Sequence, residues 1–156
     1  MSRSRRSLAV IGLFALAVQA GCATGRGNMV KVDAGRATRL DILDKVSRIL
    51  YQQGYEVQER RDTGTVIQFV TAWTTRAPFP DEASRGAFEC RTRVTFEARR
   101  GAAEIYAISL RAENSVSTTE FGADWSSPPP TQMFREHIRD VADAIALEVD
   151  MGVRMR

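Results

Sequence analysis

The chain has 156 residues, of which 44% are hydrophobic and 26% charged, a balance typical of one globular domain rather than of a disordered or multispan membrane protein. Its formal charge of +3 comes from Arg3, Arg5 and Arg6, since 22 basic residues less these three leaves 19, equal to the 19 acidic residues. The rest of the chain therefore has no net attraction to phosphates, and nucleic acid is not an expected partner.

The first 21 residues have the pattern of a secretory signal peptide. The three arginines precede an apolar run over residues 8–20 that only Gln19 interrupts. This run is shorter than the roughly 18–20 residues that a membrane-spanning helix needs, so we predict that residues 1–21 are cleaved. A permanent anchor or a buried core helix is the alternative. Residues 4–8 also partly resemble a twin-arginine export signal.

Residues 18–22, Val-Gln-Ala-Gly-Cys, resemble a bacterial lipobox, with Gln19 where that family usually has leucine. The resemblance implies that Cys22 becomes the lipidated N-terminus, carrying palmitate or a similar acyl chain. Several acyl chains together give stable anchoring. Ala23, which is not acidic, resembles the class sorted to the periplasmic face of the outer membrane. An ordinary signal peptide with a chance cysteine is the alternative. Cys90 then has no partner within the chain, so no internal disulfide is expected.

The remaining chain predicts a tether and one domain. Residues 22–36 are rich in Gly, Ala and polar residues and are predicted to be a flexible tether, followed by a single domain over residues 37–153. Residues 38–53 have apolar residues at helical spacing, with Thr38 as the N-cap and Gly54 as the stop.

Four strands follow, over residues 55–59, 65–73, 89–98 and 102–114. The third is the clearest, because Cys90 and Val94 share an apolar face while Arg91 and Arg93 share a polar one. Two long segments, residues 74–88 and 115–130, are predicted loops. A closing helix over residues 131–151 places Phe134, Ile138, Val141, Ile145 and Val149 along one side.

This order predicts an α+β fold with two layers, in which a four-stranded antiparallel sheet is covered on one face by an N-terminal and a C-terminal helix. The element order loosely resembles the helix-grip and BamC-like domains of envelope lipoproteins. That resemblance carries no residue-level motif, and a shared fold does not define a function.

No catalytic constellation stands out, so an enzyme is not predicted. His137 is the single histidine and lacks metal-ligating partners, which favours a surface or flanking role. Cys90 lies on an apolar strand face, where a free thiol is usually inert. No cofactor is expected apart from the covalent lipid on Cys22.

The loops give the sharper functional hypothesis, because antiparallel pairing should bring both to one end of the sheet. Aromatic side chains in these segments are predicted to bind a partner, another envelope protein, in outer-membrane assembly or maintenance. They are Trp73, Phe79, Phe88, Phe121 and Trp125. Packing of these rings over the core is the alternative. A second candidate function is a small-molecule or lipid carrier with its ligand between sheet and helices.

The polar sheet face offers a further possibility. Arg91, Arg93 and Arg111 are predicted to form a basic stripe that meets anionic lipid or an acidic partner, or that is balanced by neighbouring glutamates.

Overall fold

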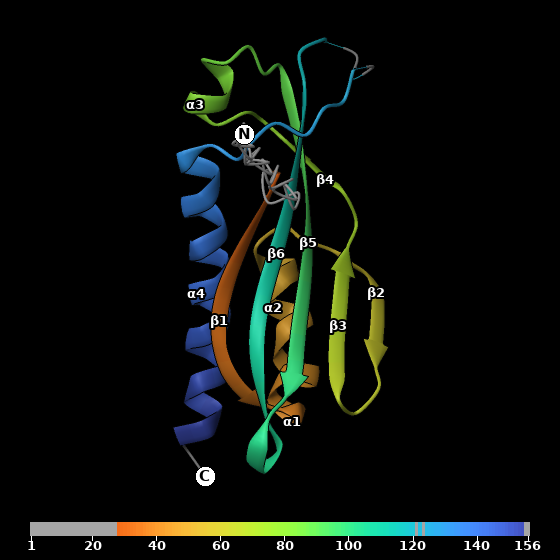
Figure 1. Ribbon diagram of the computed structural model, residues 1–156, viewed down its shortest axis with the longest axis vertical. Coiled ribbons are helices and arrows are strands. Elements are labelled where there is room, and N and C mark those ends of the chain that lie inside the picture. Colours follow the sequence, from red (N-terminus) through yellow and green to blue (C-terminus); the bar gives the residue numbers. More distant parts are fainter. Residues whose placement is uncertain (1–27, 121, 123, 155–156) are drawn as a thin grey trace, which may run out of the picture.

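The computed structural model describes residues 28–120, 122 and 124–154 and has an α+β fold, as predicted (Figure 1). The predicted signal peptide, Cys22 and Phe121 lie outside the described residues. The strands are β1 Met29–Thr38, β2 Val57–Asp62, β3 Val66–Thr71, β4 Thr74–Arg76, β5 Glu89–Arg100 and β6 Ile105–Ser117. The sheet thus has six strands rather than the four predicted.

All strand pairs are antiparallel, in the order β1-β6-β5-β3-β2, and β4 pairs with β5 beyond the end of β3. The two longest strands, β5 and β6, lie at the centre and pair from Glu89↔Ser117 to Arg100↔Tyr106. Each therefore runs nearly the full length of the domain (Figure 1). The hairpin predicted between them is confirmed, but its turn includes η2 Ala102–Glu104, so β6 starts later than predicted.

Strand β1 corrects the predicted tether. Residues 29–36 do not form a flexible linker but pair with β6, in the register Met29↔Glu113 to Thr38↔Ile105. The pairing shifts between Asp33 and Arg36, at a bulge where Gly35 adopts a φ of +85°. This bulge interrupts the strict alternation by which a strand is recognised in a sequence. Small Ala and Gly residues then give the segment the composition of a linker.

The helices begin and end close to their predicted positions. The first helical segment is continuous and comprises α1 Arg39–Asp41, η1 Ile42–Val46 and α2 Ser47–Gln52. The side chain of Thr38 accepts a hydrogen bond from the Asp41 amide, as predicted for an N-cap. The closing helix is α4 Gln132–Arg154, which lies along β1, while α2 lies behind the sheet in the view of Figure 1.

The core forms between one face of the sheet and these helices. On the sheet, Val94, Phe96 and Leu110 are fully buried, and Phe69 stacks on Phe96 with ring centroids 5.4 Å apart. The helices contribute side chains with no exposed surface, which include every position predicted for the closing helix. They are Ile42, Val46, Leu50, Phe134, Ile138, Val141, Ile145 and Val149. The predicted core faces of strands and helices are thus confirmed.

The two predicted loops are partly ordered into regular elements. Residues 74–88 contain β4 and the short helix α3 Pro80–Ala83. Residues 115–117 belong to β6, and Ser126 forms an isolated bridge with Val116. The two segments meet at one end of the sheet, as predicted, because the Phe88 amide donates to the Ser117 carbonyl at 2.8 Å. We call this end, with residues 77–88, 118–120, 122 and 124–131, the loop end.

Candidate functional site

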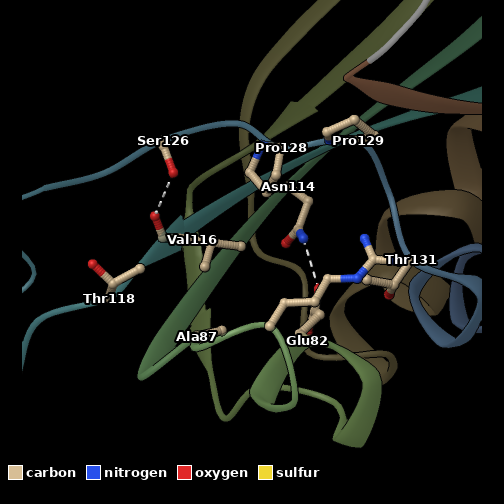
Figure 2. A pocket seen from close by; sticks show the side chains of 10 residues that line it. Glu82, Ala87, Asn114, Val116, Thr118, Ser126, Pro128, Pro129 and Thr131 are labelled. Atoms are coloured by element: carbon tan, nitrogen blue, oxygen red, sulfur yellow. Dashed lines mark hydrogen bonds between the residues drawn. The ribbon is translucent and has the colours of Figure 1, made fainter.

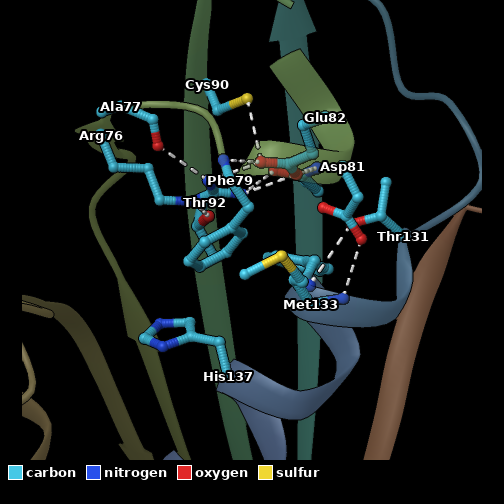
Figure 3. Close-up of polar contacts among 12 residues, drawn as sticks. Arg76, Ala77, Phe79, Asp81, Glu82, Cys90, Thr92, Thr131, Met133 and His137 are labelled. Atoms are coloured by element: carbon cyan, nitrogen blue, oxygen red, sulfur yellow. Dashed lines mark hydrogen bonds and ion pairs between the residues drawn. The ribbon is translucent and has the colours of Figure 1, made fainter. Parts of the chain in front are cut away.

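A buried ion pair joins α3 to the sheet at the loop end (Figure 3). Both guanidinium Nη atoms of Arg76 donate to the Glu82 carboxylate, at 2.7 and 2.8 Å, and the Glu82 side chain is 1% exposed. Asn114 Nδ2 and the Phe79 amide donate to the same carboxylate at 2.7 and 2.8 Å. Every oxygen of Glu82 is therefore bonded, which is the condition for a buried charge to be tolerated.

The electrostatics of Glu82 follow from this geometry. Burial opposes ionisation of the carboxyl, but the hydrogen bonds from Arg76, Phe79 and Asn114 and the positive charge of Arg76 outweigh it, so the pKa of Glu82 is lowered. Arg76 also donates to Thr92 Oγ1 at 3.2 Å and lies over the Phe79 ring at 4.2 Å. With all these groups paired, the cluster is a structural clamp between the first loop and the sheet rather than a reactive centre.

Cys90 lies beside this clamp, buried as strand alternation predicted. Its Sγ is 3.5 Å from Glu82 Oε2. Burial, and then the negative charge of Glu82, raise the pKa of the Cys90 thiol to about 12. Because the thiolate is the nucleophilic form, this thiol is unsuited to covalent catalysis.

His137 lies half-buried between α4 and the first loop rather than on the surface (Figure 3). Its Nε2 is 2.8 Å from the Tyr55 hydroxyl, and its ring centroid is 5.5 Å from that of Phe79. Burial lowers the pKa of His137 and raises that of Tyr55 to about 12. The phenol therefore keeps its proton, and its hydrogen bond with Nε2 fixes the position of the imidazole, which gives His137 a packing role.

A small cavity opens between the two loops (Figure 2). Its volume is about 150 Å³, and its lining includes Glu82, Asn114, Val116, Pro128 and Thr131. Ligand pockets usually enclose roughly 300–1,000 Å³, so this cavity suits a few waters better than a lipid. It also lies at the loop end and not between the sheet and the helices, where the carrier hypothesis would place its ligand.

The outer face of the sheet, opposite the core, carries the most distinctive arrangement. The guanidinium carbon of Arg91 lies 4.8 Å from the Trp73 ring centroid and 4.3 Å from that of Trp125. The guanidinium of Arg93 lies 4.8 Å from Trp73. The order is therefore Trp125, Arg91, Trp73, Arg93, and we call these four residues the Trp–Arg stack.

The two arginines of the stack differ in their partners. Arg93 donates to both carboxylate oxygens of Glu113 at 3.0 Å, whereas no described carboxylate lies within ion-pair distance of Arg91. The Nε atoms of both side chains are buried without a hydrogen-bond partner among the described residues. Arg91 is thus a cation in contact with two indoles, and no described carboxylate forms an ion pair with it.

On the rest of the outer face, glutamates largely balance the arginines. This is the alternative to a basic stripe that the sequence predicted. Arg99 and Arg111 approach Glu97 Oε1 at 2.7 and 3.8 Å. A hollow of about 660 Å³ lies here, lined in part by Lys31, Asp33, Glu97, Arg99 and Arg111. Among the described residues of this face, the end near Arg91 therefore combines a cation that no described carboxylate pairs with and two indole rings.

The predicted aromatic residues separate into different environments. Trp73 and Trp125 come together on Arg91, whereas Phe79 packs against the core beside Arg76. Phe88 is 55% exposed at the loop end. Packing over the core is thus confirmed for Phe79, whereas partner binding by the other rings stays a prediction. The clamp of Arg76, Glu82 and Asn114 was missed, since nothing in the sequence shows which loop charges become buried.

No protein-family model matches the chain, and no curated protein matches it. Within the described part of the chain, no helix is long and apolar enough to cross a membrane. The same residues contain no group of three or more His, Cys, Asp or Glu side chains that could hold a metal ion.

Proposed function

We propose that this protein is an envelope lipoprotein, anchored through lipid on Cys22, that binds another envelope protein without catalysing a reaction. The lipobox resemblance of residues 18–22 supports the anchor. The Trp–Arg stack on the outer sheet face is the observation that supports binding. Trp and Arg are enriched among the residues that dominate binding energy at protein interfaces.

The stack presents one chemical feature in particular. The Arg91 guanidinium contacts two indole rings, whose centroids lie 4.8 and 4.3 Å from its carbon, and its N–H donors lie in the guanidinium plane. A carboxylate in that plane can accept two hydrogen bonds at once, the arrangement that Arg favours. The indoles hold the side chain in place, which reduces the entropy lost on binding. The partner group that fits is therefore an acidic side chain.

Photo-crosslinking in the native envelope tests this proposal. The probe replaces Thr75, an exposed residue that pairs with Arg91 in the sheet. We expect one discrete protein adduct, lost when Arg91→Gln is added and retained with Arg99→Gln as the matched control. A probe at the exposed Arg48 on α2 should give none. Equal adducts from both probes, or an adduct that survives Arg91→Gln, would contradict the proposed surface.

The anchor is tested separately. Incorporation of an alkyne analogue of palmitate should be lost in Cys22→Ser, and that variant should leave the membrane fraction. Incorporation that persists in Cys22→Ser would place the lipid elsewhere or refute lipidation at this cysteine.

The carrier alternative receives less support from the same structure. The cavity between the loops is too small for an acyl chain, and the space between sheet and helices is occupied by fully buried side chains such as Phe69, Phe96 and Phe134.

A further inference from the structure

The described chain begins at the loop end of the domain. Met29, the first residue of β1, pairs with Glu113 near the end of β6, whereas Thr38 pairs with Ile105 at the opposite end. Glu89 and Ser117, which border the two loops, pair with each other at the first end. The start of β1 therefore points toward the loop end, as Figure 1 shows.

The segment between Cys22 and β1 is short. With β1 starting at Met29, only five residues lie between Cys22 and Asn28, and the six Cα–Cα intervals, at no more than about 3.6 Å each, span at most roughly 22 Å. Strand β6 has 13 residues, which at about 3.4 Å per residue give a length of roughly 44 Å. A lipid on Cys22 would thus hold the loop end, and not the far hairpin, close to the bilayer.

Among the described residues, some of the large apolar side chains that are exposed belong to segments at this end, whereas Leu40, Tyr51 and Leu147 lie on α1, α2 and the second half of α4. Phe88, Met29 and Met133 are 55%, 44% and 37% exposed. They come from the first loop, the start of β1 and the first turn of α4, three segments that are distant in sequence. Apolar and aromatic side chains partition favourably into the interface of a bilayer. Exposed charges in these segments have both signs, with Arg85 and Arg135 against Glu120 and Glu136, so we expect no strong preference for anionic lipid.

We infer that the loop end is a membrane-contacting surface, with Phe88, Met29 and Met133 at the headgroup level of the lipid bilayer. This inference rests on the proposed lipid anchor at Cys22. It leaves the sheet upright on the membrane, with the Trp–Arg stack on the outer sheet face next to the loop end, to which Trp125 also belongs.

Fluorescence quenching of the full-length lipidated protein in phosphatidylcholine vesicles tests the orientation. A single cysteine is introduced at Ala83, exposed at the loop end, or at Ala102, exposed in the far hairpin, and is labelled with bimane. Cys90 is buried and Cys22 would carry the thioether, so neither competes for the label. A quencher attached to the lipid headgroup should quench bimane at residue 83 at least threefold more than at residue 102.

Flotation of the same vesicles separates the two proposals. If the protein does not float with the lipid, the anchor fails and the orientation fails with it. If the protein floats but quenching is equal at both positions, or greater at residue 102, the anchor stands and the orientation is wrong. A further variant, Phe88→Ser, should reduce quenching at residue 83 without changing flotation, and unchanged quenching would exclude Phe88 from the contact.

Discussion

Glu82 illustrates how one residue can organise a loop. Its carboxylate is 1% exposed and joins the Arg76 guanidinium, the Asn114 amide and the Phe79 backbone. Replacing only one member of a buried ion pair leaves the other charge desolvated, which is more costly than the pair itself is stabilising. The sheet end and α3 depend on this clamp for their relative position.

We predict that Glu82→Gln lowers the free energy of unfolding by about 3–5 kcal/mol, the range for breaking a buried pair. Urea denaturation measures this loss. The matched control is Glu104→Gln, because Glu104 is 82% exposed in its ion pair with Arg100 and exposed pairs contribute at most about 1 kcal/mol. The double variant Arg76→Met with Glu82→Leu should recover much of the stability. A loss for Glu82→Gln no larger than the control's would contradict the clamp.

We predict that His137 makes the free energy of unfolding depend on pH. Burial, followed by the positive charge of Arg76, lowers its pKa in the folded state, so the unfolded chain binds the proton more readily. Stability is then complete above the unfolded pKa of about 6.5 and falls as the pH drops below it. The chain has one histidine, so the interval from pH 8 to 5.5 reports on this residue.

We expect the wild type to lose stability across that interval and His137→Gln to lose markedly less, as measured by urea denaturation at each pH. Tyr55→Phe is the control, because it removes the hydroxyl but keeps the burial that lowers the pKa of His137. A slope unaffected by His137→Gln would assign the titration to another group.

At the scale of elements, β1 departs most from the predicted fold, because its residues were predicted to form a tether. Its pairing with β6 and its packing against α4 make it part of the sheet, and Val30, Ala34 and Ala37 are buried. The strand lies at one edge of the sheet. A charged β2 at the other edge, with Glu59, Arg60, Arg61 and Asp62, discourages pairing with another chain.

A pair of neighbouring substitutions distinguishes a strand from a tether. Val30→Ser should cost about 2 kcal/mol, because it removes buried apolar surface, whereas Lys31→Ser should change stability by no more than about 0.5 kcal/mol at an exposed position. Thermal and urea denaturation both measure the difference. Equal effects would mean that this segment does not pack on the domain.

At the scale of the whole molecule, the short segment before β1 would make the orientation of the domain depend on the proposed lipid anchor. A long tether would let the domain rotate freely above the bilayer, but six residues restrict it. The same end carries the exposed Phe88, and Arg91 contacts two indoles on the adjoining outer sheet face. Trp125 belongs both to the loop end and to the Trp–Arg stack, so the proposed lipid contact and the proposed protein contact adjoin each other there.

The sequence alone determined the elements whose periodicity is regular. Alternation in β5 identified its buried face, and helical spacing in α4 identified Phe134, Ile138 and Ile145 as core residues, because each pattern repeats with the backbone period. The meeting of the two loops also followed from strand order. Only the tertiary structure decided two things: the elements in which that periodicity fails, and the contacts between residues that are distant in sequence. The bulge at Gly35 prevented recognition of β1 in the sequence. Folding alone brings together the segments in which Arg76 bonds to Asn114 and Arg91 contacts Trp73 and Trp125.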